Sequence, residues 1–421
     1  MVAAAIFLAA SGHAQVRDTL KLTLKQAEDQ FLEKNLSLMA SRYNIDQAKA
    51  SIITARLFEN PTVGFENILY NPETRKVFDL SHDGGQYNAS ISQLFQTAGK
   101  RNKNIALAKI TVQQAQYQFF DLLRTLRYTL RTDFYTIYFK EQSAAVYQEE
   151  IGALQKTLAS FRQQYQQDNI AKKEVLRIQS QLYTLQAELA SLQEEIDDTQ
   201  SEFKLLIHSA APVYIYPVSG STEVSADVLK GSTYAGLLDA AERNRYDLQA
   251  AQASVEYSTV NLKLQRALAV PDFSLSLTYD KNGSTVRNYS GVGISIPIPL
   301  FNRNQGAIRA ARVAIDQSKV TLNQQQEQIR SELDNSYQSA LRLQGLLSGF
   351  DPVFRNDFNM LIGQVMLNYR KRNIGILEFL DFYDSYKTNA LQMNTLQLNQ
   401  INALEQLNYV TGTSLFNRIN K

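Results

Sequence analysis

The amino-acid sequence carries one pattern twice, and this duplication limits the possible folds more than any other feature. Leu38–Pro61 aligns without a gap on Leu248–Pro271, and Arg56 and Arg266 occupy the same place in the two segments. Later landmarks recur in the same order, because Tyr165, Asn169 and Ile170 return as Tyr369, Asn373 and Ile374. Ordered landmarks indicate repeated structural units, whereas a chance similarity between polar helices would not preserve them.

The duplication divides the chain into four parts after its first residues. We predict a first repeat over residues 20–208 and a second over 234–412. Residues 209–233 contain Pro212, Pro217 and several small polar residues, which are typical of a connector. The remaining residues, 413–421, are expected to form a C-terminal tail.

The first residues resemble a secretory signal in composition. Val2–Ala10 is apolar but too short to span a bilayer, which needs about 20 residues. Gly12 and Ala14 give the small-x-small pattern of a cleavage site, so we predict a signal peptide over residues 1–14 and a mature protein that begins at Gln15. An apolar N-terminal strand or helix is the alternative interpretation. The chain has no cysteine, which excludes disulfides and thiolate metal sites.

The first repeat begins with a predicted helix over residues 19–58, which Pro61 ends. Residues 63–70 and 86–95 have strand character, and the polar segment 71–85 between them carries the turn signals Asn71-Pro72 and Gly84-Gly85. The first repeat is therefore expected to present a β-hairpin after its first helix.

The second repeat shows its strands more plainly. Apolar and polar residues alternate over 273–279 and again over 292–300, which indicates a sheet with one apolar face. Asp280-Lys281-Asn282-Gly283 is the predicted turn between these strands. Pro297 and Pro299 lack the N–H that a strand donates, so they should mark the end of the second strand.

Long helices follow each hairpin. Residues 100–167 contain no proline and would form a helix of roughly 100 Å at 1.5 Å per residue. Leucines and aromatics recur along it and along the returning helix at steps of three and four, which predicts helix pairs packed as coiled coils. In the second repeat Gly349 and Pro352 should break the corresponding helix.

The composition contains little that favours catalysis or nucleic-acid binding. Lysine and arginine number 43 against 41 acidic residues, so the net charge of +2 gives no field for nucleic acid. His13, His82 and His208 are isolated, and we predict no catalytic residues, no cofactor and no metal site. The basic run Thr97–Arg101 lacks the glycine spacing of a phosphate-binding loop. It suits either lipid headgroups at a membrane boundary or a solvated helix start.

Helix, hairpin, long helix, tip and long helix, followed by a connector and the same order again, resembles the TolC-like outer-membrane efflux protein family. The resemblance runs from about Leu20 to Phe416 and is carried by the ordered landmarks rather than by one motif. It implies an α+β membrane protein with long antiparallel coiled-coil helices. Three protomers would contribute four strands each to a 12-stranded β-barrel, and the helices would form an α-barrel.

The resemblance also implies location and partners. A member of this family is a passive homotrimeric channel in the outer membrane of a Gram-negative bacterium, with its helical barrel in the periplasm. It contacts outer-membrane lipid, a periplasmic adaptor (membrane fusion protein) and an inner-membrane RND-type pump that supplies the energy. A periplasmic coiled-coil scaffold or adaptor is the alternative function, although such a protein has no need for four amphipathic strands.

The resemblance places a periplasmic gate at the tip of the second repeat. Glu378 and Asp381 lie three residues apart, on one helix face, and Glu174 is their counterpart in the first repeat. A solvated acidic helix face is the alternative. The family's type member has a basic latch residue where this chain has Ile374, so a gate salt bridge would use Arg372 or be absent. The predicted adaptor-docking residues are Tyr165, Asn169, Ile170, Tyr369, Asn373, Ile374 and Gly375. The chain resembles the branch paired with heavy-metal cation pumps, while drugs and other solutes stay open as cargo.

Overall fold

A computed structural model describes residues 18–209, 212–219, 228–282, 286–349, 354–371 and 373–416. The predicted signal peptide (1–14), Arg372 and Pro352 lie outside these residues. Contacts divide the chain into two compact units, residues 1–39, 122–244 and 329–421 in one and 40–121 and 245–328 in the other. Within the described residues no helix is both long and apolar enough to cross a membrane.

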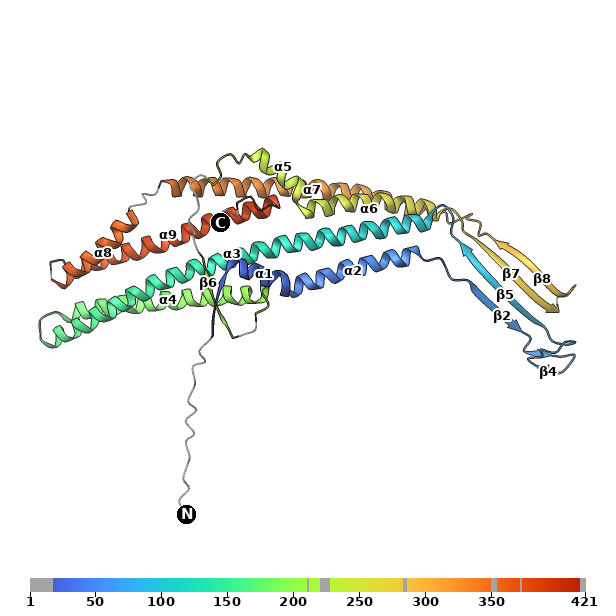
Figure 1. The fold of residues 1–421 in the computed structure, drawn as a ribbon, viewed down its shortest axis with the longest axis horizontal. Helices are drawn as coiled ribbons and strands as arrows, with labels where there is room; N and C mark the ends of the chain where they lie inside the picture. The colour runs from blue at the N-terminus through green and yellow to red at the C-terminus, as the bar shows by residue number, and fades with distance from the viewer. Residues whose placement is uncertain are drawn as a thin grey trace, which may run out of the picture. The chain divides into compact units, whose positions relative to one another are not determined.

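The order of elements repeats, as the sequence predicts (Figure 1). The first copy has helices α1 (Leu24–Lys34), α2 (Leu36–Arg56), α3 (Lys100–Gln166) and α4 (Lys172–Leu206). The second copy has helices α5 (Tyr234–Asn244), α6 (Tyr246–Leu268), α7 (Gln305–Ser348), α8 (Phe354–Arg370) and α9 (Ile376–Thr411). The predicted break in the second copy is confirmed, because α7 ends at Ser348 while α3 is continuous. The repeat boundaries themselves stay a prediction.

A threonine side chain caps the N-terminus of the first helix in each copy. The Oγ1 of Thr23 accepts the N–H of Gln26 at 3.3 Å, and the N–H of Thr23 donates to Oε1 of Gln26 at 2.9 Å, which forms a capping box. In the second copy the hydroxyl of Thr233 accepts the N–H of Gly236 at 3.2 Å. The continuous helix predicted over 19–58 is wrong in two places. Strand β1 (Thr19–Thr23) pairs in parallel with β6 (Tyr214–Val218), and Asn35 separates α1 from α2.

Four strands form one antiparallel sheet in the order β2-β5-β7-β8 (Figure 1). They are β2 (Thr62–Asn67), β5 (Tyr87–Phe95), β7 (Phe273–Asn282) and β8 (Arg287–Ser295). The register places Val63, Ile91, Leu277 and Val292 in one row across the sheet. These side chains are exposed, Val63 by 75% and Val292 by 73%, so the predicted apolar face is present and uncovered in the protomer.

The second hairpin is displaced from its prediction. β7 continues through Asp280 and Lys281 to Asn282, and β8 begins at Arg287, earlier than predicted. β8 ends at Ser295, so the prediction that Pro297 and Pro299 mark the end of this strand is confirmed. Three of the four predicted turn residues extend the strand, while Gly283 lies outside the described residues, and the first repeat holds two of the three. Lys281 Nζ donates to the carbonyl of Ser81 at 3.1 Å, and Asn282 Nδ2 donates to the carbonyl of Gly85 at 2.8 Å.

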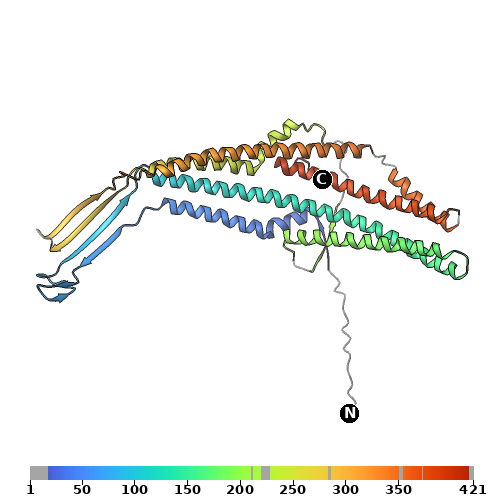
Figure 2. The same cartoon turned by 180° about the vertical axis from the view of Figure 1, so that it is seen from behind.

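The polar loop between β2 and β5 has structure of its own. It lies at the end of the sheet away from the helices of the same unit and contains the two-residue strands β3 (Tyr70–Asn71) and β4 (Lys76–Val77) (Figure 2). Asp79 accepts hydrogen bonds from the hydroxyl of Thr74 at 2.7 Å and the N–H of Ser81 at 3.0 Å. Hydrogen bonds from Ser81 and Thr74 lower the pKa of Asp79 from 3.8 to about 2. The loop is therefore fixed by a charged carboxylate throughout the physiological pH range.

The basic run at the end of β5 does not match either predicted role at Lys100, which is buried rather than solvated. Its ammonium donates to Asp272 Oδ1 and to the carbonyl of Val270, both at 2.7 Å. The N–H of Thr97 donates to the same carboxylate at 2.7 Å. The contact fastens the turn before α3 to the turn before β7, and these bonds to Lys100 and Thr97 lower the pKa of Asp272 against the effect of burial.

Replacing Lys100 with methionine should destabilise this junction. The substitution keeps the length of the side chain but removes charged hydrogen bonds, each worth about 1.5–3 kcal/mol. The midpoint of thermal unfolding, followed by circular dichroism, should fall. Lys103→Met is the matched control, because the half-buried Lys103 donates to the carbonyl of Ala98, which belongs to the same turn before α3. Equal effects of the two variants would contradict a specific role for Lys100.

Candidate functional site

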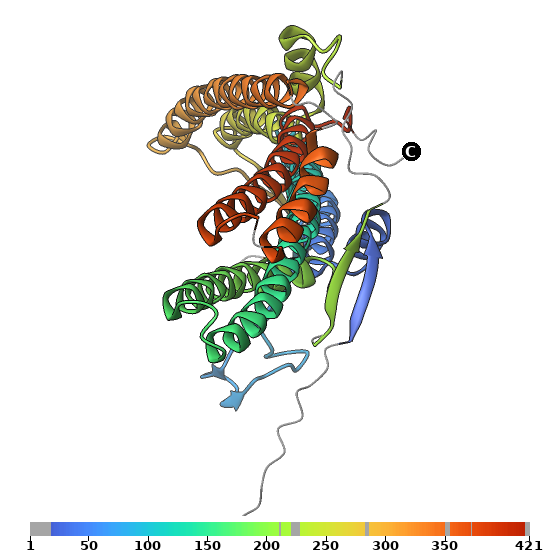
Figure 3. The same cartoon turned by 90° about the vertical axis from the view of Figure 1, so that its left-hand side faces the viewer.

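The tips are the two turns that join α3 to α4 and α8 to α9. They lie side by side at one end of the unit that contains residues 122–244 and 329–421 (Figure 3). Aromatic rings pack between these helices. Tyr369 stacks on Phe379 with ring centroids 4.1 Å apart and an interplanar angle of 8°. Phe161 and Tyr383 extend the stack at 5.6 Å and 5.1 Å. Leucines and isoleucines of α3 and α4 surround it in one core.

An acidic groove adjoins this stack on α9. Glu378, Asp381 and Asp384 follow at steps of three, and all three line a cavity of about 710 Å³ with Arg177 of α4. The first of them lies in the first turn of α9, where the positive end of the helix dipole stabilises a carboxylate. The groove is open to solvent, and among its described lining residues three carboxylates outnumber one guanidinium. Such an arrangement attracts cations electrostatically.

The structure brings together two of the three predicted gate residues. Glu378 and Asp381 share the groove, whereas Glu174 is not among its lining residues and is half-buried in the first turn of α4. The pKa of the Tyr369 hydroxyl is raised by burial and by the charge of Glu174, which places that carboxylate near the aromatic stack. The gate role of all three residues stays a prediction, and Arg372 lies outside the described residues.

The predicted docking residues differ in accessibility. Tyr165, Asn169, Asn373 and Gly375 are exposed, and Ile170 and Ile374 are half-buried. Tyr369 is only 7% exposed, so its side chain can support a docking surface from below but cannot form one. The docking role of these residues stays a prediction.

Two residues of the groove were missed by sequence reasoning. Asp384 continues the three-residue spacing of Glu378 and Asp381, and this spacing could have identified it. No comparable signal marks Arg177, which reaches the groove from another helix. Within the described residues, no group of three or more His, Cys, Asp or Glu side chains could hold a metal ion.

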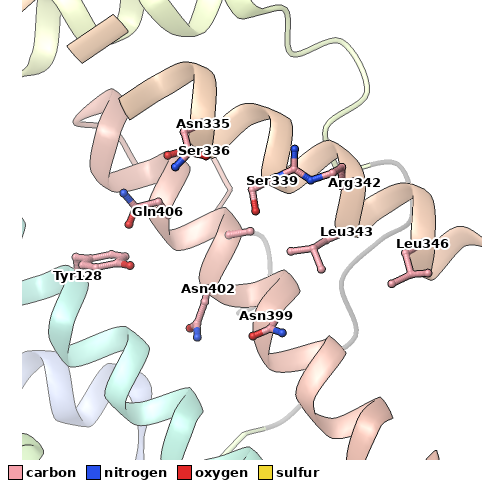
Figure 4. Close-up of a pocket in the computed structure, with 11 residues that line it drawn as sticks. Tyr128, Asn335, Ser336, Ser339, Arg342, Leu343, Leu346, Asn399, Asn402 and Gln406 are labelled. Carbon is pink, nitrogen blue, oxygen red and sulfur yellow. The ribbon is translucent and has the colours of Figure 1, made fainter. Parts of the chain in front are cut away.

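A second cavity, of about 520 Å³, lies between the C-terminal part of α7, α9 and Tyr128 of α3 (Figure 4). Amides and hydroxyls dominate its lining, with Asn399, Asn402 and Gln406 projecting from α9. Arg342 is the charged residue that α7 contributes, and none of the described lining residues has a carboxylate. Such a surface can hydrogen-bond water and polar solutes but contains no acid–base pair.

The sequence was also compared with known proteins. A family model described as outer membrane efflux protein matches residues 28–207 and 237–349. The chain belongs to this family. Membership makes it an efflux protein of the outer membrane, and the matched residues include Leu38–Pro61 and its repeat Leu248–Pro271. The efflux proteins of this family are channels rather than enzymes.

The sequence identity to individual relatives is low. The cobalt-zinc-cadmium resistance protein CzcC of Cupriavidus metallidurans is 23% identical over 343 residues, which is 79% of this chain and 78% of that protein. The Campylobacter jejuni CmeC outer membrane channel superposes with a TM-score of 0.71 at 11% identity, over 92% of this chain and 85% of that one. VceC from Vibrio cholerae gives 0.70 at 16% identity, over 93% and 96%. The fold is therefore that of the outer membrane efflux proteins, α+β with long helices.

Proposed function

We propose that three copies of this protein form a passive exit duct of a tripartite efflux system. The observation that carries the proposal is the four-stranded sheet. One face of it is apolar and exposed, and within the described residues β2 and β8 pair on one side only. Open strand edges cannot be satisfied in lipid, and four strands are too few to close a barrel. Three copies would close a 12-stranded β-barrel with its apolar face toward outer-membrane lipid.

The long helices would continue the duct through the periplasm as an α-barrel. Their exposed tips, with Asn169, Asn373 and Gly375, suit docking to a periplasmic adaptor that joins the channel to an RND-type inner-membrane pump. The duct itself is passive, so the pump supplies the energy. This arrangement requires an outer-membrane trimer, and a water-soluble monomer would contradict it and favour a periplasmic scaffold.

The cargo we propose is cationic, with heavy-metal ions as the first candidates. The resistance named for the relative CzcC concerns cobalt, zinc and cadmium. The acidic groove supports the same choice, because a threefold arrangement would put six carboxylates of Glu378 and Asp381 around one axis. At an effective dielectric constant near 20, two unit charges about 6 Å apart repel by roughly 3 kcal/mol. Such a ring resists tight closure unless cations bridge it, which makes it a candidate gate.

Planar-bilayer recordings test the gate. Glu378→Ala combined with Asp381→Ala should raise single-channel conductance and weaken the preference for cations, because the repelling ring is removed. The control removes the same charge from α4 by Glu194→Ala and Asp198→Ala, both at exposed positions. Unchanged currents in the Glu378/Asp381 variant, or equal changes in the control, would assign the gate to other residues.

A further inference from the structure

Beside the acidic groove, a lysine is buried among carboxyl groups from three helices. Lys387 of α9 is 8% exposed. Its Nζ lies 3.1 Å from Oε2 of Glu188 on α4 and 3.2 Å from Oδ1 of Asp384 on its own helix. The first contact joins α9 to α4, and the second joins the lysine to a residue that also lines the acidic groove.

A third carboxyl group, on α3, interacts electrostatically with this lysine. Glu150 is only 2% exposed, and its Oε1 is buried without a hydrogen-bond partner among the described residues. The charged groups that act on it are Lys387 and Asp384 on α9, Glu188 on α4 and Glu149 on α3. Tyr383 of α9 and Tyr147 of α3 also interact electrostatically with Glu150. An ionised carboxylate in this position would be expensive, since a buried charge needs a partner.

Burial keeps Glu150 protonated at neutral pH. Burial raises its pKa from 4.5 to about 8, the nearby carboxylates raise it further, and Lys387 opposes them. Below that pH the neutral Glu150 cannot compete for the ammonium, which therefore stays with Glu188 and Asp384. Above it Glu150 becomes a buried anion that attracts Lys387, and the interaction between buried charges is stronger than one near solvent.

We propose that Lys387 is a proton-controlled clamp, which holds α9 to α4 while Glu150 is protonated and transfers its ammonium to Glu150 on α3 when Glu150 loses its proton. The proton leaves to solvent and no other group is consumed. Because Asp384 shares Lys387 with Glu188, the transfer also changes the charge balance of the acidic groove. Only this last consequence rests on the proposed function, and the clamp itself does not.

Double-mutant cycles at two pH values test the clamp without any channel measurement. The variants are Lys387→Met, Glu188→Gln and Glu150→Gln, alone and in pairs, with the midpoint of thermal unfolding as the readout. At pH 6 the Lys387–Glu188 pair should be coupled, so that the unfolding midpoint of the double variant falls no further than that of one single variant. The effects of Lys387→Met and Glu150→Gln on the midpoint should be additive at this pH. At pH 9 the coupling should move to Lys387–Glu150. Asp133, whose pKa is about 7, is present in every variant and cancels from each cycle.

Two outcomes would overturn the clamp. One is additivity of Lys387 and Glu150 at both pH values, and the other is a Lys387–Glu188 coupling that does not change with pH. Lys387→Arg keeps the charge and should keep both couplings, so it provides the measurement if Lys387→Met does not fold.

Bilayer recordings then connect the clamp to the duct. Conductance of the unchanged protein should vary between pH 6 and pH 9, and Glu150→Gln should remove this variation while leaving cation preference unchanged. If no channel forms, the duct proposal fails while the cycles still decide the clamp. If the channel forms and Glu150→Gln keeps the pH dependence, the link from the clamp to the groove is wrong.

Discussion

Replacing Arg131 with methionine should lower the free energy of unfolding by about 3–5 kcal/mol, the usual cost of breaking a buried ion pair. The guanidinium of Arg131, on α3, joins helices from both ends of the chain. Nη1 lies 2.8 Å from Oε1 of Glu28 on α1, and Nη2 lies 2.6 Å from Oε1 of Glu405 on α9. Arg131 and Glu405 are both buried. Without the guanidinium, Glu405 would be a buried carboxylate that has lost its counter-ion.

The effect of Arg131→Met should be separable from a general loss of positive charge. Lys156→Met removes one exposed charge from the same helix and should leave the unfolding midpoint nearly unchanged. Adding Glu28→Gln and Glu405→Gln to Arg131→Met should recover part of the loss, because the stranded carboxylates are then removed. A triple variant less stable than Arg131→Met alone would show that the guanidinium acts mainly through packing.

Replacing Asp133 with asparagine should flatten the dependence of stability on pH. Asp133 is buried on α3, and its Oδ2 has no hydrogen-bond partner among the described residues. Burial raises its pKa from 3.8 to about 7, and the charge of Glu202 adds to this effect. The folded protein therefore holds the proton more tightly than the unfolded chain, and stability is lost as the pH rises from about 4 to about 7.

The loss attributable to Asp133 is on the order of 4 kcal/mol, since each pKa unit corresponds to about 1.4 kcal/mol. Thermal unfolding midpoints measured from pH 4 to pH 8 should therefore fall less steeply in Asp133→Asn than in the unchanged protein. Part of the slope should remain, because the raised pKa of Glu150 acts in the same direction. Asp198→Asn changes an exposed carboxylate and should keep the full slope. A slope unaltered by Asp133→Asn would mean that the carboxyl finds a partner or solvent.

Local signals in the sequence predicted most of the fold. Period-two alternation identified the strands, and the duplication predicted the order of elements in the second copy. The turn predicted from Asp280 was wrong as far as Asn282, because these residues are turn formers by themselves, yet Asn282 is held in the strand by the carbonyl of Gly85 from the other repeat. Turn propensity contains no information on such a partner.

Less of the candidate site could be predicted from the sequence. Glu378 and Asp381 were predicted from the family resemblance and from their spacing of three residues, and they do share one groove. Glu150, Glu188 and Lys387 lie on three different helices, each crowded with polar residues. Periodicity does not indicate which carboxylate of a polar helix is buried, because that depends on which helix packs against it. Lys100 was misassigned for the same reason, since its partner Asp272 belongs to the other copy.

The ladder between β5 and β7 has a consequence for biogenesis. It joins the two copies of the pattern, so the sheet cannot form until synthesis has passed Asn282. Strand pairings between segments that are distant in sequence form slowly. Until β5 pairs with β7, the first hairpin exposes its apolar face. Until the strands of both copies have paired, the unpaired chain is therefore prone to aggregation.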